Sequence, residues 1–325
     1  MKNIVLFDTS VGTTNKGDDI IMNSAVQGLS EILDSNFVVN IPTHITPFSW
    51  FQTKYWWKAK WVKEADMKFI CGTNLLWNTL FRPVNDLNIN ILNCDPLCNS
   101  VLVGVGNSLL DKKIDWYTKR IYDKVLSHDY IHSTRDDETT EMLVKLGFKA
   151  TTTGCVTLWG LTPKHCATIP SMKADEVVFT LTGPQRDDKR DQLMVDILKK
   201  NYSKRYFYVQ TIWDMDYFRT LNGLDDVEII SPDLKSYGTF LESHDVDYVG
   251  TRLHGGVFAM QHGKRSIIIT IDNRARNINK VSNLNSLERN KINELDDLIN
   301  STIITNITMD YNKLNRWKNQ FIDKK

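Results

Sequence analysis

The sequence predicts an α/β protein with two doubly wound domains that face each other across a cleft. Three observations support this prediction. Short runs of β-branched and aromatic residues alternate with stretches of helical periodicity, a pattern typical of parallel sheets covered by helices on both faces. The chain has 325 residues, which suits two domains of ordinary size. The alternation lapses once, near the middle of the chain, and then resumes.

In the first half, short apolar runs mark the strands, and apolar residues three and four positions apart mark the helices. One helix is expected from Asp19, with apolar residues through Leu33. Another is expected from about Asp136 to Leu146, where Gly147 can cap its carboxyl end. The expected strands of this half are Ile4–Phe7, Phe37–Ile41, Met67–Cys71, Val101–Val105 and Tyr130–His132.

The alternation of strand-like and helix-like segments is interrupted between about Gly160 and Asp175, where the sequence has two prolines and no clear period. We therefore expect a first domain over residues 1–160, a linker over 161–175 and a second domain over 176–325. The expected strands of the second half are Glu176–Leu181, Arg205–Gln210, Val227–Ile230, Asp247–Gly250 and Ser266–Ile271. The expected helices are Arg190–Lys200, Leu234–His244, Gly255–His262, Ala275–Leu284 and a last one over 311–322, which could fold back onto the first domain.

Composition excludes several classes of protein. The 40 basic and 39 acidic residues nearly balance, which argues against a general nucleic-acid binder. No apolar run approaches the ~20 residues of a membrane helix, and Met1–Asp8 has the pattern of a strand and not of a signal peptide. We expect a soluble cytoplasmic protein, with peripheral association at the inner face of the membrane left open.

The sequence gives no indication of a metal or a resident cofactor. Five cysteines are an odd and sparse set. Cys94 and Cys98 have metal-like spacing, but no second pair accompanies them, and reduced structural thiols are the simpler interpretation. No histidine–carboxylate cluster has the spacing of metal ligands.

Three polar turns between a strand and a helix could carry chemistry, because ligands of doubly wound folds bind beyond the carboxyl ends of the strands. The first follows the first strand and contains Asn15, Gly17 and Asp18. Its glycine permits close backbone approach, and the helix N-terminus offers N–H groups to an anion or a sugar hydroxyl. The alternative is a polar turn in which an acidic residue only caps the helix.

The second turn is Ser133–Asp137. Its aspartates are well explained as helix caps, whereas the guanidinium of Arg135 suits a carboxylate or phosphate. The third turn contains Arg252, His254, Gly255 and Gly256.

At the third turn, Arg252 can form a bidentate pair with an anion, and His254 can transfer a proton near neutral pH. Two glycines at a helix start cost stability, which we interpret as room for a ligand at the backbone. A core-packed histidine beside a surface arginine is the alternative. Arg274, after the next strand, is expected to close around the same ligand.

A dense aromatic cluster lies between Trp50 and Trp61. Stacking on a sugar ring is one interpretation, and packing in the core or under a lid is the other, favoured one.

Together the three turns resemble those of the polysaccharide pyruvyl transferase family: Asn15-x-Gly17-Asp18, Ser133-x-Arg135-Asp136 and Arg252-Leu253-His254-Gly255. The segment Asp66–Trp77, with Gly72 and Asn74, resembles the glycine-rich stretch that follows the third strand of that family. The resemblance spans about residues 1–285. The family often has glycine where Thr73 stands and aspartate where Cys155 stands.

The resemblance implies two Rossmann-like domains arranged as in GT-B glycosyltransferases. It also implies transfer of a pyruvyl group from phosphoenolpyruvate to two sugar hydroxyls, forming a cyclic ketal in a cell-surface polysaccharide. Arg252 and His254 would contact phosphoenolpyruvate with help from Arg135. The acceptor, a lipid-linked or nucleotide-linked sugar, would bind near Asn15, Gly17 and Asp18.

On this hypothesis His254 is the general acid, Arg252 and Arg135 bind the anionic groups, and Asp18 or Asp136 accepts the hydroxyl proton. One alternative is a glycosyltransferase of the same fold that uses a nucleotide-sugar donor. Another is a carbohydrate- or anion-binding protein without catalysis.

Overall fold

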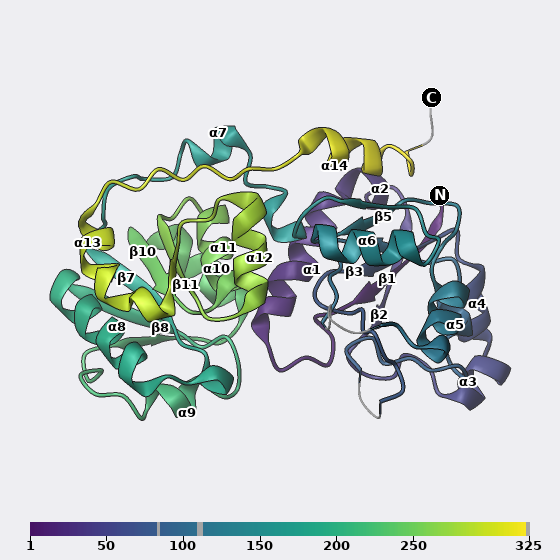
Figure 1. Ribbon diagram of the computed structural model, residues 1–325, viewed down its shortest axis with the longest axis horizontal. Helices are drawn as coiled ribbons and strands as arrows, with labels where there is room; N and C mark the ends of the chain where they lie inside the picture. Colours follow the sequence, from purple (N-terminus) through teal and green to yellow (C-terminus); the bar gives the residue numbers. More distant parts are fainter. Residues whose placement is uncertain (83–84, 109–112, 323–325) are drawn as a thin grey trace. The chain divides into compact units, whose positions relative to one another are not determined.

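The computed structural model describes residues 1–82, 85–108 and 113–322. The chain forms two α/β units, each with a parallel sheet and its own core (Figure 1). Unit 1 contains Met1–Thr13, Ile21–Trp159 and Met309–Lys325, and unit 2 contains Thr14–Ile20 and Gly160–Thr308.

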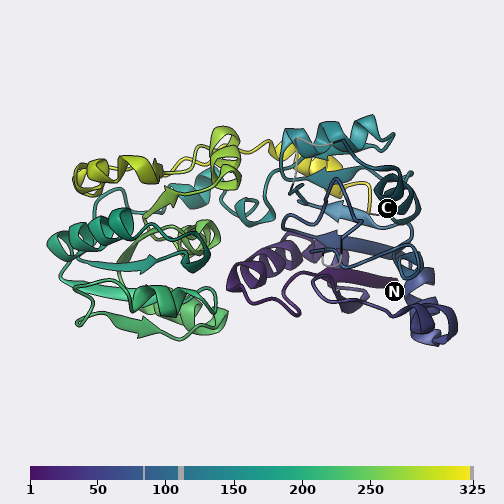
Figure 2. The same cartoon turned by 60° about the horizontal axis from the view of Figure 1, so that its bottom comes forward.

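These bounds differ from the expected domains at two places, and at a third the last helix folds back onto the first unit, which the sequence left open. Residues 14–20 group with unit 2, because their backbone bonds to Gln210 and Thr211. Residues 161–175 belong to unit 2 and are not a separate linker, since His165 Nε2 bonds to the Met260 carbonyl at 2.8 Å. The last segment returns to the unit that holds the N-terminus, as the yellow ribbon shows in Figures 1 and 2.

The main sheet of unit 1 has the parallel order β2-β1-β3-β4. In its register Ile4 pairs with Val38 on one side and with Met67 on the other. A second, two-stranded parallel sheet follows. The strands are β1 (Asn3–Asp8), β2 (Phe37–Pro42), β3 (Met67–Cys71), β4 (Val101–Val103), β5 (His132–Thr134) and β6 (Ala150–Thr152).

Side chains join these two sheets together with one backbone bridge, between Val105 and Thr134. The Leu102 N–H donates to His132 Nδ1 at 3.2 Å, and the Gly104 N–H donates to Ser133 Oγ at 2.9 Å. Strand β5 begins two residues later than expected because Ile131 bonds through its N–H and carbonyl to Gln320 and Trp317 instead of to a strand.

Apolar clusters cover both faces of the main sheet of unit 1. One contains Val5, Phe7 and Ile70, and the other contains Ile4, Leu6 and Phe69. The helices are α1 (Lys16–Gly28, whose start lies in unit 2), α2 (Ser30–Leu33), α3 (Trp50–Tyr55), α4 (Trp57–Glu64), α5 (Trp116–Val125), α6 (Asp137–Lys145) and α14 (Tyr311–Lys318). Gly147 follows α6 with φ of +93°, as its expected capping role requires.

Unit 2 has one six-stranded parallel sheet in the order β12-β11-β10-β7-β8-β9. From β7 the chain builds outward through β8 and β9, then returns to the other side of β7 for β10, β11 and β12. The strand order therefore reverses between β7 and β10. The strands are β7 (Glu176–Thr180), β8 (Lys204–Tyr208), β9 (Glu228–Ile230), β10 (Val246–Gly250), β11 (Ser266–Thr270) and β12 (Ser286–Glu288).

Helices α8, α9 and α13 pack on one face of this sheet around Phe179 and Phe207. On the other face, Tyr237 of α10 stacks on Tyr208 of β8 at 3.9 Å between ring centroids, and Phe258 of α11 lies against Tyr237. The helices are α7 (Pro163–Cys166), α8 (Asp188–Asn201), α9 (Asp214–Phe218), α10 (Leu234–Ser243), α11 (Leu253–Gln261), α12 (Asn273–Ser282) and α13 (Leu295–Asn300). Both units are thus doubly wound, which confirms the predicted fold class. Among the described residues, no helix combines the length and the apolar composition that crossing a bilayer requires.

Candidate active site

A pocket lies at the carboxyl edge of the unit 2 sheet, where the strand order reverses. Segments that follow β7, β8, β10 and β11 contribute to it, together with one residue of the segment before α1. A reversal of strand order at this edge separates two neighbouring loops and leaves a crevice between them. The lining residues are Asn15, Thr182, Pro184, Gln185, Gln210, Thr251, Arg252, Leu253, His254, Ile271, Asp272 and Ala275.

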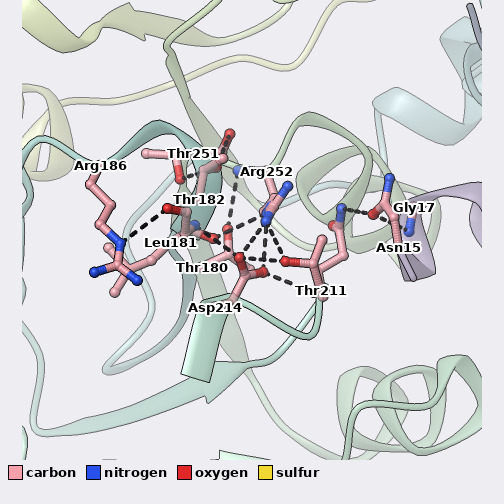
Figure 3. A network of polar contacts seen from close by, with 12 residues as sticks. Asn15, Gly17, Thr180, Leu181, Thr182, Arg186, Thr211, Asp214, Thr251 and Arg252 are labelled. Carbon is pink, nitrogen blue, oxygen red and sulfur yellow. Dashed lines mark hydrogen bonds and ion pairs between the residues drawn. The ribbon is translucent and has the colours of Figure 1, made fainter. Parts of the chain in front are cut away.

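Arg252 enters this pocket with part of its guanidinium already bound (Figure 3). Its Nε donates to the Leu181 carbonyl and to Asp214 Oδ2, both at 3.1 Å. Its Nη2 donates to Thr211 Oγ1 at 2.7 Å and also to Asp214 Oδ1. The side chain is therefore fixed in one orientation before any ligand arrives.

Asp214, the partner of Arg252, is fully buried at the start of α9. Its Oδ1 accepts from the Gly183 N–H at 3.0 Å and from Thr211 Oγ1 at 2.8 Å, and its Oδ2 accepts from the Thr211 N–H at 2.9 Å. A buried carboxylate is stable only when it is paired and its lone pairs are satisfied. These contacts meet that condition, so Asp214 holds Arg252 and neutralises its charge.

The third nitrogen of Arg252, Nη1, forms no hydrogen bond with any residue that the structure describes. Because Asp214 occupies the edge formed by Nε and Nη2, the expected bidentate pair with an anion cannot use that edge. Nη1 is the donor left for a ligand in the pocket.

His254 lies in the first turn of α11, is almost fully buried and lines the same pocket. Arg252 is the N-cap residue of this helix, with extended backbone angles. The amino end of α11, where backbone N–H groups carry partial positive charge, therefore lies at the pocket. The site combines a guanidinium N–H, an imidazole and a helix N-terminus, which suits an anionic ligand that exchanges a proton.

Gly256 serves packing, contrary to the sequence-based interpretation, whereas Gly255 borders the pocket-lining Gln210. A Cβ on Gly256 would lie 2.6 Å from Tyr248 Cε1 and 2.9 Å from Ile268 Cγ1. A Cβ on Gly255 would lie 3.0 Å from Gln210 Oε1. Glycine is needed at position 256 because α11 lies directly on Tyr248 of β10 and Ile268 of β11.

The segment before α1 contributes Asn15 to the pocket. The Lys16 N–H donates to the Gln210 carbonyl at 2.8 Å, and Gln210 Nε2 donates to Asn15 Oδ1 at 3.0 Å. The same Oδ1 accepts from the Gly17 N–H at 3.0 Å, so Asn15 also caps the start of α1. Asp18 is buried in the first turn of α1 and is not among the lining residues.

Sequence reasoning missed Gln210, which is almost fully buried and lines the pocket. Its Oε1 accepts no hydrogen bond from the described residues. A buried acceptor without a donor is costly, so this oxygen suits a ligand hydroxyl or N–H. The available signal was a polar residue at the carboxyl end of the strand run Arg205–Gln210. The same signal could have drawn attention to Thr211 and Thr182.

Apart from Arg274, the remaining predicted residues lie in unit 1. A Cβ on Gly106 would lie 2.5 Å from Arg135 Nη2 and 2.8 Å from Asn74 Oδ1. The side chains of Arg135 and Asn74 therefore both lie against Gly106. Arg135 is buried and pairs with Asp136 at 3.4 Å. Asp136 caps α6 by accepting from the Thr139 N–H at 2.8 Å.

Gly72, the first residue after β3, adopts φ of +69°. Arg274 lies in α12, and its side chain is outside the part of the chain that the structure describes. Within the described ranges, no group of three or more histidine, cysteine or acidic side chains is arranged to hold a metal ion.

A family model described as polysaccharide pyruvyl transferase matches residues 15–273. No curated protein matches the sequence significantly.

Solved structures resemble the whole chain. S. aureus MnaA with UDP is 12% identical, with a TM-score of 0.55, over 100% of this chain and 99% of that one. The UDP-GlcNAc 2-epimerase of Methanocaldococcus jannaschii with UDP-GlcNAc and UDP is 14% identical, with a TM-score of 0.54, over 97% of both chains. At these identities the likeness shows the fold alone, and it agrees with two Rossmann-like units of the GT-B kind.

Proposed function

The chain belongs to the polysaccharide pyruvyl transferase family, a family of transferases, and on that premise we propose that it transfers the pyruvyl group of phosphoenolpyruvate to a sugar. Two hydroxyls of the acceptor receive the group as a cyclic ketal. The acceptor is a lipid-linked or nucleotide-linked sugar of a cell-surface polysaccharide.

The unit 2 pocket is the observation that carries this proposal. Phosphoenolpyruvate has a phosphate and a carboxylate beside an enol ether carbon. Arg252 Nη1 and the amino end of α11 offer donors to these anionic groups. His254 lies beside Arg252 in the chain and lines the same pocket, where an imidazolium can donate a proton. Gln210 Oε1 offers an acceptor to a hydroxyl or N–H.

Two protons leave the sugar hydroxyls. One of them replaces the proton that His254 gives to the methylene carbon, and the other leaves on the phosphate as hydrogen phosphate. His254 donates a proton to the methylene carbon of phosphoenolpyruvate, and the neighbouring carbon becomes oxocarbenium-like. One sugar hydroxyl adds to this carbon and loses its proton. The second hydroxyl then displaces phosphate and loses its proton, which closes the ketal. Asp18, which follows the Asn15–Gly17 segment in the same unit, is our candidate base for the hydroxyl proton, and it is buried outside the pocket lining.

The alternative is a glycosyltransferase with a nucleotide-sugar donor. It is favoured by one observation, the similarity of fold to structures solved with UDP. In that case Arg252 and the α11 N-terminus would bind a diphosphate, and the pocket would hold no enol ether.

The test is an assay of phosphate release from phosphoenolpyruvate with a panel of lipid-linked and nucleotide-linked sugars, with product mass showing the ketal. His254→Ala should abolish turnover while the binding of phosphoenolpyruvate stays measurable. His262→Ala is the matched control, because His262 lies at the other end of α11 and outside the pocket lining.

Turnover that survives His254→Ala would contradict the general-acid role. No turnover with any acceptor, together with tight binding of a nucleotide-sugar, would favour the glycosyltransferase. Binding without turnover of either donor would favour a non-catalytic binding protein.

A further inference from the structure

Helices α3 and α4 of unit 1 carry large aromatic side chains that the fold does not bury. Packing in the core or under a lid was the favoured expectation for this cluster, and it is wrong for five of its members. Their exposed fractions are 51% for Trp50, 64% for Phe51, 61% for Tyr55, 37% for Trp56 and 68% for Trp57. We call these five residues, with Lys54 and Lys58 between them, the aromatic–lysine surface.

Local contacts support the two helices although this surface is exposed. Ala59 and Val62 are the buried residues of α4, whereas α3 buries none. Ser49 and Gln52 form a capping box at the start of α3, which fixes its first turn. Phe48 is buried beneath Trp56, with ring centroids 6.2 Å apart. The aromatic rings are therefore presented on an ordered support.

Positive charge is concentrated on the same segment. Residues 50–64 contain four lysines and one glutamate, although the whole chain has a net charge of only +1. Lys54 lies 5.4 Å from the Trp50 ring centroid, and Lys58 lies 5.1 Å from that of Trp56. Among the described residues, neither lysine has a carboxylate within 4.0 Å, whereas Lys60 and Lys63 pair with Glu64 and Asp95.

We propose that the aromatic–lysine surface binds the anionic surface of a phospholipid bilayer. Tryptophan and tyrosine favour the level of the headgroups, where one part of the ring is apolar and another is wet. Lysines near the membrane add attraction to anionic lipids. A protein partner fits less well, because lysine is depleted at protein–protein interfaces. This inference does not depend on the proposed function of unit 2.

The test is co-sedimentation of the full-length chain with vesicles of phosphatidylcholine alone or mixed with anionic phosphatidylglycerol. We expect binding to the mixed vesicles that weakens with added salt, because surface charge is screened. Lys54→Glu with Lys58→Glu should weaken this binding by about tenfold or more. Phe51→Ser with Trp57→Ser should weaken it to a similar extent by removing apolar area.

Each double variant has a matched control in unit 2. Lys164→Glu with Lys189→Glu changes the net charge equally at exposed lysines elsewhere. Met172→Ser with Ile304→Ser removes two exposed apolar side chains, 62% and 75% accessible. Both controls should bind the vesicles like the unaltered chain.

Three results would overturn the proposal. The first is no sedimentation with anionic vesicles, and the second is equal loss of binding in the variants and their controls. The third is self-association, measured by sedimentation velocity, that Phe51→Ser with Trp57→Ser abolishes in a chain that binds no vesicles. In that case the surface would be an interface between two copies. None of these results bears on phosphate release from phosphoenolpyruvate, so failure here is distinguishable from failure of the proposed function.

Discussion

Arg252 enters the pocket with three of its five N–H donors already used. Asp214, Thr211 and the Leu181 carbonyl hold Nε and Nη2, and Nη1 is left for a ligand. An arginine fixed in this way loses little side-chain freedom when a ligand binds, which favours affinity. The sequence drew attention to Arg252 through its place in a turn. It could not show Asp214, because an aspartate 38 positions away carries no pattern that links it to this arginine.

Asp214→Asn should destabilise the chain by about 3 kcal/mol, because it leaves the partly buried guanidinium of Arg252 without its charge partner. It should also abolish transfer, since Nη1 loses its fixed position. Urea unfolding followed by tryptophan fluorescence and the phosphate-release assay measure the two effects. Asp216→Asn is the control, because Asp216 lies in the same helix but is 71% exposed, and it should change stability by less than about 0.5 kcal/mol. Equal stability of the two variants would contradict the role given to Asp214.

Thr73 has φ of +35°, a left-handed conformation in which a β-branched residue is strained. It follows Gly72, and the family resemblance also places a glycine at this position. Thr73→Gly should therefore stabilise the chain by about 1 kcal/mol, the relief of strain exceeding the backbone entropy that glycine adds. Asn99→Gly is the control, because asparagine tolerates its φ of +59°. Chemical unfolding of both variants measures the difference, and a loss of stability in Thr73→Gly would show that the threonine is not strained.

At the scale of elements, strands with apolar runs were predictable and short helices were not. Strands β1, β3 and β10 differ by one residue or less at each end from their expected bounds, because continuous apolar runs identify buried parallel strands. Helices α3 and α4 were missed because they bury little and have no apolar stripe. Gly256 of α11 was misinterpreted because tight packing on a strand and access for a ligand both favour a residue without a side chain.

The contact between β4 and β5 makes stability depend on pH. His132 is fully buried, and burial lowers its pKa to about 4. Its Nδ1 accepts from the Leu102 N–H, and its Nε2 lies 2.9 Å from the Ser127 carbonyl. The folded state therefore requires the neutral ring, because a proton on Nδ1 would oppose the Leu102 N–H.

Stability should fall as the pH is lowered from about 6.5 to about 4, because the unfolded chain takes up the proton of His132 over this range and the folded chain does not. His132 contributes a slope of about 1.4 kcal/mol per pH unit to the free energy of unfolding, and the total loss of stability is about 3 kcal/mol. Urea midpoints at a series of pH values measure it. His132→Asn should flatten the curve, and His128→Asn, at an exposed histidine, should not. An unchanged slope in His132→Asn would assign the pH dependence to other groups.

At the scale of the whole molecule, unit 1 is completed by a segment that follows unit 2 in the chain. Leu314, Trp317 and Phe321 belong to the apolar cluster that contains Ile4 and Phe69. The Trp317 indole N–H donates to the Ile131 carbonyl at 2.7 Å. Periodicity predicted a helix here, but the face of the sheet that it covers depends on contacts between residues far apart in sequence.

Trp317→Ala should destabilise unit 1 by roughly 3–5 kcal/mol, because it removes a buried indole and leaves a cavity. Amide hydrogen exchange in strands β1 and β3 should be faster than in the unaltered chain, and exchange in β7 and β10 should be unchanged. Trp57→Ala removes the same side chain from an exposed position and should leave all four strands as they were. Similar exchange in the two variants would mean that the C-terminal segment adds little to the core of unit 1.

This return of the chain also affects the order in which the two units can finish folding during synthesis. Ribosomes release a chain from its amino end, and the domain that emerges first usually folds first. Here the sheet of unit 1 is translated early, but one of its faces lacks Leu314 and Trp317 until residues beyond Thr308 have emerged. All of unit 2 is translated by then. The unit that begins the chain is therefore the last to be completed, and until then it exposes apolar surface that a nascent chain must keep from aggregating.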